Sequence, residues 1–161
     1  MIIRLANKND IHEIASVHIK SWFETYTGVI PQSILDQQSL EKRCLMWKDI
    51  FTDSCQRVYV VEDQGVICGF MNVRLTPEST CSELKKLYIL NRAQGQGLGR
   101  QFIEKALQFS RNHHYQYMRC RVLSANTSRI FYEKTGACFI RKTPATDFGE
   151  GIDDLDYQWV L

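Results

Sequence analysis

Three alternating glycines between Gln94 and Arg100 constrain this chain more than any other stretch, because an apolar run precedes them and a helical pattern follows. The segment reads Gln-Gly-Gln-Gly-Leu-Gly-Arg, and the preceding run, Leu84–Leu90, is typical of a buried strand. Glycine permits positive φ angles and has no Cβ to block a ligand, and the first turn of a helix leaves N–H groups unpaired. A strand, a glycine turn and a helix in this order therefore predict an anion site, most simply for a phosphate.

Known phosphate-binding patterns narrow this prediction. A P-loop needs Lys-Ser/Thr after its last glycine, but Leu98-Gly99-Arg100 follows Gly97. The dinucleotide pattern Gly-x-Gly-x-x-Gly needs its third glycine one residue later, and no acidic partner for a ribose is evident downstream. The spacing fits Gln/Arg-x-x-Gly-x-Gly, carried by Gln94, Gly97 and Gly99. The alternative is an ordinary strand–helix turn whose glycines allow close packing, and the rest of the chain must decide between the two.

Length and composition exclude several classes of protein. The chain has 161 residues, 44% hydrophobic and 24% charged, as expected for a single globular domain spanning 1–161. A net charge of +2 without any Lys/Arg block argues against a nucleic-acid partner, and no apolar run approaches the ~20 residues of a membrane helix. We expect no metal site, because no two of the six cysteines are spaced as Cys-x-x-Cys. Reduced cysteines in apolar surroundings favour a cytoplasmic protein.

The hydrophobic pattern changes period along the chain. A first strand at Met1–Ala6 precedes helical spacing over roughly 9–50, and alternating segments between Arg57 and Leu90 predict three strands. A helix over Leu98–Asn112, a strand, a helix closed by Gly136 and two final strands complete the order. Hairpins first and crossover helices later predict an α/β (α+β) fold, with a mixed, mostly antiparallel central sheet of about seven strands flanked by helices.

A second cluster, Asn126-Thr-Ser-Arg-Ile-Phe-Tyr-Glu-Lys-Thr-Gly136, follows the glycine segment. Together the two segments resemble the GCN5-related N-acetyltransferase (GNAT) family, which carries an Asn…Phe-Tyr-Glu-Lys-x-Gly segment after its acyl-CoA loop. Ser21–Pro31 and Tyr157-x-Trp159 look like the amino-terminal helix and closing strand of many bacterial members, so the resemblance covers essentially the whole chain. It implies the acyl-CoA N-acyltransferase fold and an acetyl-CoA-dependent N-acetyltransferase, with acetyl-CoA as the acyl-donor substrate and no metal.

The resemblance also implies which residues bind coenzyme A. The pyrophosphate would meet the backbone of the glycine loop, which comprises Gln94, Gly95, Gln96, Gly97, Leu98, Gly99 and Arg100. The strand before the loop would pair its backbone with the pantetheine arm at Leu87, Tyr88 and Ile89, as though the arm were another strand. Asn126 would contact the arm, and a helix cap is the alternative role for this residue.

Direct acetyl transfer to an amine moves two protons, and the resemblance implies a residue for each. Tyr132 would be the general acid that protonates the departing thiolate, with packing on the sheet as the alternative. Glu83 would accept the amine proton, directly or through water, because an alkylamine with a pKa of about 10.4 is mostly protonated at neutral pH. A solvated carboxylate at the strand end is the alternative for Glu83. No cysteine has an evident activating base, so we expect no acetyl-cysteine intermediate.

The acceptor is the least constrained part of the prediction. Trp22 and Tyr26 lie about one helical turn apart and are candidates for the acceptor pocket, with core packing as the alternative. The acidic loop 147–156 would attract a cationic acceptor, or it is simply solvated. The sequence therefore predicts acetyl transfer to a primary amine of a small molecule. A protein or peptide acceptor and a non-catalytic CoA-binding module are the alternatives, no nucleic-acid or membrane partner is indicated, and a homodimer is left open.

Overall fold

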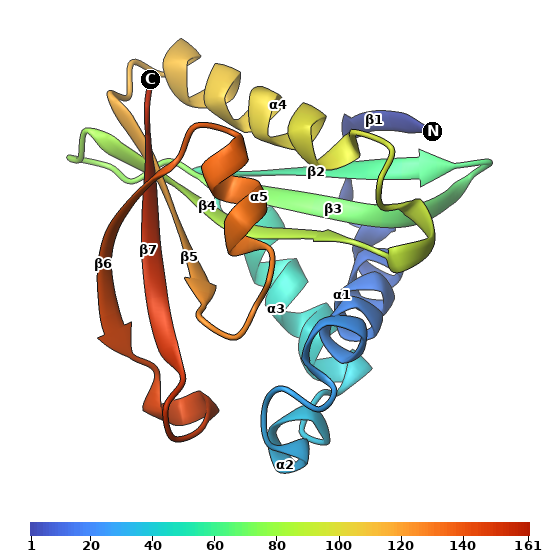
Figure 1. The fold of residues 1–161 in the computed structure, drawn as a ribbon. Helices are drawn as coiled ribbons and strands as arrows, with labels where there is room; N and C mark the ends of the chain where they lie inside the picture. The colour runs from blue at the N-terminus through green and yellow to red at the C-terminus, as the bar shows by residue number, and fades with distance from the viewer.

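The computed structural model describes all residues from 1 to 161, and its centre is a seven-stranded sheet in the order β1-β2-β3-β4-β5-β7-β6 (Figure 1). Every neighbouring pair of strands is antiparallel except β4 and β5, which are parallel. The predicted mixed, mostly antiparallel sheet is therefore confirmed. The strands are β1 (Ile2–Leu5), β2 (Gln56–Asp63), β3 (Val66–Arg74), β4 (Cys81–Ile89), β5 (Tyr117–Leu123), β6 (Cys138–Pro144) and β7 (Asp153–Val160).

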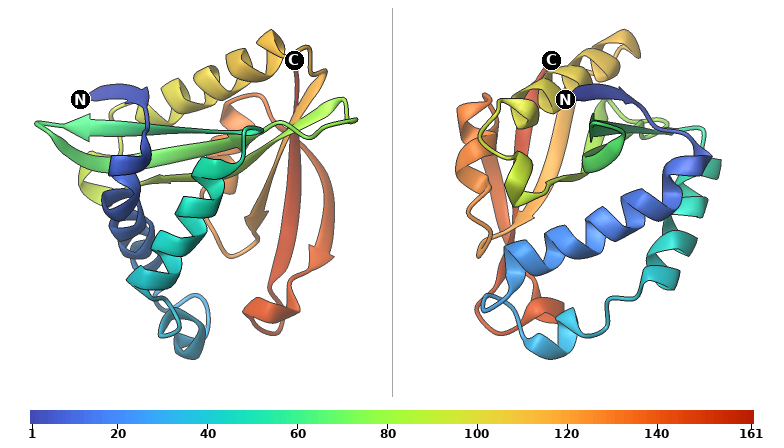
Figure 2. Two further views of the ribbon diagram at one scale, coloured as in Figure 1. Left: turned by 180° about the vertical axis from the view of Figure 1, so that it is seen from behind. Right: turned by 90° about the vertical axis from the view of Figure 1, so that its right-hand side faces the viewer.

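Helices cover both faces of the sheet. α1 and α3 lie together on one face, and α4 and α5 lie on the other (Figures 1 and 2). The crossover through α4 is what allows β4 and β5 to run parallel. None of the helices has the length and apolar character that crossing a membrane requires. The helices are α1 (Ile11–Tyr26), α2 (Gln32–Leu35), α3 (Leu40–Thr52), α4 (Leu98–Asn112) and α5 (Arg129–Lys134).

Two hydrophobic clusters hold these layers together. The main core joins 29 buried residues, with Trp47 of α3 packed edge-on against Phe70 of β3 at a centroid distance of 5.0 Å. A smaller cluster of five residues, including Tyr26, Leu35 and Leu123, joins the end of α1 to α2, the end of β5 and the loop after β6. The second cluster therefore fixes the end of α1 against the carboxyl end of β5.

The pairing of β4 with β5 is short. The two strands are in register only from Cys81–Leu84 to Tyr117–Cys120, and beyond these residues they diverge (Figure 1). On the other side of β4, the ladder to β3 passes from Leu84 to Lys86 and leaves Lys85 as a bulge. From Lys85 to Ile89, one edge of β4 is therefore open although the strand lies in the middle of the sheet.

The sequence pattern also predicts that the helix closed by Gly136 spans Asn126–Thr135, and its start differs in the structure. The helix expected from Asn126 begins at Arg129, because the Asn126 side chain accepts a hydrogen bond from the N–H of Ser128 at 2.9 Å and holds a turn. Asp10 is the N-cap residue of α1, although its side chain makes no cap hydrogen bond to that helix. Asn7 forms a capping box with Asp10 around a short 3-10 turn, and α1 follows directly.

Candidate active site

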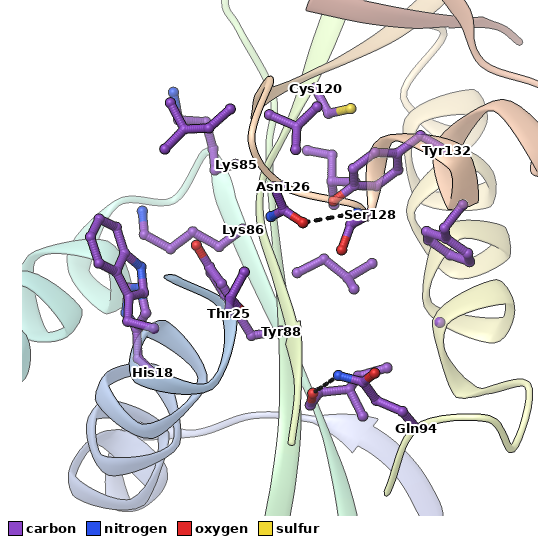
Figure 3. Close-up of a pocket in the computed structure, with 18 of the residues that line it drawn as sticks. His18, Thr25, Lys85, Lys86, Tyr88, Gln94, Cys120, Asn126, Ser128 and Tyr132 are labelled. Atoms are coloured by element: carbon purple, nitrogen blue, oxygen red, sulfur yellow. Dashed lines mark hydrogen bonds between the residues drawn. The ribbon is translucent and has the colours of Figure 1, made fainter. Parts of the chain in front are cut away.

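A cavity of about 780 Å³ follows the open edge of β4 from the glycine loop to α1 (Figure 3). This volume is in the range of small-molecule and cofactor sites. Tyr132 and Gln94 lie on one side of β4, and His18, Thr25 and the Lys86 side chain lie on the other side (Figure 3). We call these two parts of the cavity the α4 side and the α1 side.

The glycine loop supplies unpaired N–H groups to the α4 side. Gly95 and Gly97 both have a φ of 76°, and Gly97 is the N-cap of α4. The first bond of the helix runs from the Gln101 N–H to the Gly97 carbonyl at 3.2 Å, so the N–H groups of Gly95–Arg100 have no backbone acceptor. A Cβ added at Gly95 or Gly97 would meet no protein atom within 4 Å. The loop therefore presents donors and the positive end of a helix to open space, as an anion site requires.

Gly99 has a different role from the other two glycines. Its φ is not positive, and a Cβ placed there would lie 3.0 Å from Cζ of Phe131. Close packing of α4 against α5 therefore explains this third glycine. The Gln94 side chain completes the loop by donating from Nε2 to the Ile89 carbonyl at 2.8 Å, which ties the loop to the end of β4.

Tyr132 brings a hydroxyl to the same side. Its ring packs edge-on against Trp159 at a centroid distance of 5.8 Å, and its hydroxyl points into the cavity without a protein partner (Figure 3). Burial raises the pKa of Tyr132 well above its ordinary value, so the phenol keeps its proton at neutral pH. Cys120 also lines the cavity, and burial raises the pKa of its thiol to about 12. This site therefore offers a proton donor and a poorly nucleophilic thiol.

Aromatic rings from α1 form the wall of the α1 side. Trp22 packs against Tyr26 at a centroid distance of 5.0 Å and against Phe148 at 6.2 Å. The Tyr26 hydroxyl accepts a hydrogen bond from Nδ2 of Asn126 at 3.1 Å, which links α1 to the turn before α5. Asn126 thus bonds both Tyr26 and Ser128, so its turn-forming role and its place in the cavity wall hold together.

Two cations and a neutral histidine complete the α1 side. The Arg43 guanidinium of α3 lies 5.2 Å from the ring centre of Trp22, and the Lys86 ammonium lies 5.9 Å from that of Trp47. Burial, with the nearby charges of Lys85 and Arg43, lowers the pKa of Lys86 to about 8. His18 is only 2% exposed, and burial, with the charges of Arg43 and Lys86, lowers its pKa to about 2. This side of the cavity is therefore electropositive.

Known proteins share this architecture. A family model described as "Acetyltransferase (GNAT) domain" matches residues 25–161. The chain belongs to the GNAT acetyltransferase family. A Bacillus subtilis (strain 168) protein named "Uncharacterized N-acetyltransferase YuaI" is 33% identical over 135 residues, which make up 81% of this chain and 76% of that protein.

Solved GNAT structures match the fold of this chain over nearly all its length. PaiA N-acetyltransferase from Thermoplasma acidophilum, solved in complex with coenzyme A, has a TM-score of 0.80 at 17% identity and covers 100% of both chains. The structure of yncA from Salmonella typhimurium, solved with its cofactor acetyl-CoA, has a TM-score of 0.77 at 21% identity over 100% of this chain and 94% of that one. The predicted family and fold are confirmed, and the chain is an acetyl-CoA-dependent N-acetyltransferase. No group of three or more His, Cys, Asp or Glu side chains is placed to hold a metal ion.

The cavity of this GNAT enzyme brings together most of the residues that the sequence singled out. They are Trp22, Tyr26, Leu87, Tyr88, Ile89, Gln94, Gly95, Gly97, Leu98, Gly99, Arg100, Asn126 and Tyr132. Gln96 is exposed and does not line the cavity. Glu83 is the other exception, and its position follows from the pairing of the strands.

Glu83 lies before the point where β4 and β5 diverge, still in register with Arg119 of β5. Its side chain is 41% exposed, and one carboxylate oxygen is 3.3 Å from the Lys85 ammonium. It lines a smaller cavity of about 210 Å³ that shares Leu84, Lys85, Cys120 and Arg121 with the main one. Any contact between Glu83 and the main cavity must therefore pass between the diverging strands.

The acidic loop contributes less to the cavity than its composition suggests. Asp156 binds Arg121 at 2.8 Å and Arg141 at 2.7 Å, and Asp153 lies 3.4 Å from the Lys142 ammonium. Asp147 and Glu150 are exposed. Asp154 is the only carboxylate that lines the main cavity, and burial raises its pKa.

Sequence reasoning missed Arg43, Lys86 and His18. Lys86 carried a signal, since Lys85 and Lys86 interrupt an otherwise apolar strand pattern between Leu84 and Leu90. Arg43 stands four residues before the buried Trp47, on the inward side of α3, which is an unusual place for an arginine. His18 lies on the apolar face of α1, and its buried side chain gives no sequence signal that separates it from a core residue.

Proposed function

We propose that this enzyme transfers the acetyl group of acetyl-CoA directly to a primary amine of a small molecule. One observation carries the proposal: a single cavity joins the unpaired N–H groups of Gly95–Arg100, the open edge of β4, the Tyr132 hydroxyl and an aromatic compartment. We further propose that 1–161 form one acetyltransferase domain, because β1 and β7 belong to the same sheet.

Coenzyme A would occupy the α4 side. The N–H groups of Gly95–Arg100 would bind the pyrophosphate, and the exposed Arg100 guanidinium would add a charge-assisted contact. The pantetheine arm would then extend along Leu87–Ile89, with its amides bonded to the open edge of β4. Asn126 uses one N–H of its amide for Tyr26, so its second N–H is free for the arm. PaiA and yncA, which share this fold, were solved with coenzyme A and acetyl-CoA, which supports coenzyme A as the ligand of this cavity.

The chemistry follows from these positions. The amine nitrogen attacks the thioester carbon, the new C–N bond forms and the C–S bond breaks, so the electron pair leaves on sulfur. Burial keeps the Tyr132 phenol protonated until charge develops on the sulfur. Tyr132 then donates its proton to the thiolate, and the proton that the nitrogen loses as the amide forms restores the phenol. A free N–H on the edge of β4 would hydrogen-bond the thioester oxygen as its charge grows. The amine proton would pass to Glu83 through water, because the two cavities meet at Leu84 and Cys120.

The shape of the α1 side favours a small acceptor over a protein. Its walls are the rings of Trp22, Tyr26 and Phe148, and the smaller hydrophobic cluster closes the end of α1 against β5. A peptide would need a groove open at both ends. The cationic acceptor suggested by the acidic loop is supported only by Asp154, which faces two cations across the same cavity.

A turnover screen tests the proposal. CoA thiol release would be measured with acetyl-CoA and simple amines, polyamines, amino acids, aminoglycosides and short peptides. We expect turnover with at least one small amine. Turnover with peptides alone would favour the protein-acceptor alternative. Calorimetric binding of acetyl-CoA without turnover of any amine would favour a non-catalytic CoA-binding module.

The cellular setting is also a proposal. All six cysteines are unpaired thiols, which supports a cytoplasmic location. We propose no nucleic-acid or membrane partner, and light scattering coupled to gel filtration would decide between a monomer and a homodimer. Cell fractionation would test the location directly.

A further inference from the structure

Arg43 and Lys86 are two half-buried cations that no carboxylate of the protein balances. The Arg43 guanidinium donates to Oε1 of Gln38 and lies 3.8 Å from the sulfur of Met46. The Lys86 ammonium has neither a hydrogen bond nor an ion pair to any protein group, and its nearest aromatic contact is Trp47. Both side chains line the α1 side of the cavity.

Several other arginines of this protein have carboxylate partners, both half-buried and exposed ones. Arg4 binds Asp10 at 2.8 Å and Glu62 at 2.8 Å. Arg121 and Arg141 share the carboxylate of Asp156. Half-buried Arg57 lacks a carboxylate too, but it donates to the carbonyls of Ser54 and Gln56 and lies outside the cavity, whereas Lys86 has no such partner.

Two cations without a carboxylate partner in one cavity wall are costly to bury. A charge removed from water loses hydration that only a partner of opposite sign or several hydrogen bonds can replace. Contact with the rings of Trp22 and Trp47 offsets only part of this loss. Burial, followed by the charges of Lys85 and Arg43, lowers the pKa of Lys86 to about 8. An anion placed between Arg43 and Lys86 would remove both penalties.

We infer that the α1 side binds a carboxylate carried by the acceptor, so the acceptor class is an amino acid. This inference rests on the proposed function and specifies its substrate. A planar guanidinium matches the two oxygens of a carboxylate, and the Lys86 ammonium supplies a second, point-like contact. The glycine loop cannot be the partner of these cations, because it lies on the other side of β4 with the positive end of α4 (Figure 3).

A carboxylate elsewhere in the cavity wall orients the amine of the acceptor. Asp154 is the one carboxylate in the cavity wall, and it is 3.9 Å from the Arg121 guanidinium. It is in register with Leu123 of β5, which belongs to the same small hydrophobic cluster as Tyr26. Arg43 and Lys86 repel an ammonium, and Asp154 attracts it. The acceptor therefore binds with its carboxylate toward α3 and its amine toward the gap between β4 and β5, where Tyr132 lies.

The experiment compares matched acceptors. CoA release would be measured for a panel of amino acids, their amides and the corresponding decarboxylated amines at saturating acetyl-CoA. We expect kcat/KM for the best amino acid to exceed that for its amide by about tenfold or more, since a hydrogen bond to a charged group is lost in the amide. Arg43→Gln and Lys86→Met should each bring this ratio close to one. Lys42→Gln removes an exposed cation of the same helix, outside the cavity, and should keep the wild-type ratio.

A binding measurement distinguishes a failure of this inference from a failure of the proposed function. N-acetyl amino acids and their amides would be titrated into the CoA-loaded protein by calorimetry, with variants first checked for an unchanged fold by circular dichroism. Tighter binding of the acids, lost in Arg43→Gln, supports the inference even if no amine is turned over. Equal binding of acids and amides, or a preference that survives both substitutions, overturns it. A wild-type preference for succinyl-CoA over acetyl-CoA that these substitutions abolish would place the anion on the donor and also overturn it.

Discussion

Replacing Gly97 by alanine separates the cost of the loop conformation from its role in binding. Gly97 has a φ of 76° and ψ of 0°, and an L-residue in this left-handed region costs about 1–2 kcal/mol. The new Cβ meets no protein atom within 4 Å, so no clash adds to this cost. We therefore expect the free energy of unfolding to fall by about 1–2 kcal/mol and the melting temperature by about 2–8 °C.

Gly65→Ala is the matched control. Gly65 has a φ of 83° in the turn between β2 and β3, its Cβ would also meet nothing within 4 Å, and it is not part of the cavity. The two variants should therefore lose similar stability. Only Gly97→Ala should weaken acetyl-CoA binding, because its methyl group occupies the space that the pyrophosphate enters and the strained loop turns its N–H groups away.

Calorimetry would measure the dissociation constant of acetyl-CoA for both variants, and thermal unfolding would be followed by circular dichroism. We expect the affinity of Gly97→Ala to fall at least about tenfold, which is about 1.4 kcal/mol, with no change in Gly65→Ala. If Gly97→Ala loses stability but keeps the wild-type affinity, the pyrophosphate does not bind at this loop and the reasoning fails.

The remaining predictions concern protons. Tyr132→Phe should lower kcat by about 10²–10⁴ without changing the acetyl-CoA dissociation constant, and full kcat with chemistry rate-limiting would make Tyr132 a packing residue. Glu83→Gln should slow turnover most at neutral pH and recover at high pH, where the free amine is abundant; an unchanged pH–rate profile would exclude Glu83 as the base. Lys86 has a pKa of about 8 and is charged below it, so KM for an amino acid should rise above pH 8 in the wild type and stay flat in Lys86→Met. His18 has a pKa of about 2 in the folded state and about 6.5 in the unfolded state. Below about pH 6.5 the unfolded state therefore binds a proton at this side chain and the native state does not. Stability should therefore fall by up to about 2 kcal/mol between pH 7 and pH 5, and urea titrations of His18→Gln should show a smaller loss.

The glycine loop was predictable because its requirements are local. Gly95 and Gly97, which have positive φ angles, lie within a few residues of the start of α4 in the sequence. The same holds for the turn at Asn126, whose side chain bonds a residue two positions away. The order of strands and helices along the chain was predictable for the same reason, because hydrophobic periodicity and turn residues are local signals. Their order in the sheet was not, because β7 lies between β5 and β6.

The charged half of the site was not predictable from spacing. Arg43 of α3 and Lys86 of β4 line one cavity because α3 packs with α1 on one face of the sheet, and no short-range sequence pattern predicts that arrangement. The ion pairs of the acidic loop depend on the strand order β5-β7-β6, which places Asp156 between Arg121 and Arg141. Glu83 falls outside the main cavity because the ladder to β5 still continues at that residue. Each outcome depends on partners far away in the chain.

The short ladder between β4 and β5 divides the sheet into two plates, β1–β4 and β5–β7–β6, joined along one corner. A continuous sheet resists bending because every neighbouring strand is bonded along its length, whereas these plates share only the pairs from Cys81 to Leu84. A pantetheine arm bound along the open edge of β4 would bridge the two plates and stiffen the connection between them. The same backbone edge that recognises the donor would then set the angle between the two plates, and with it the width of the gap through which the amine must reach the thioester.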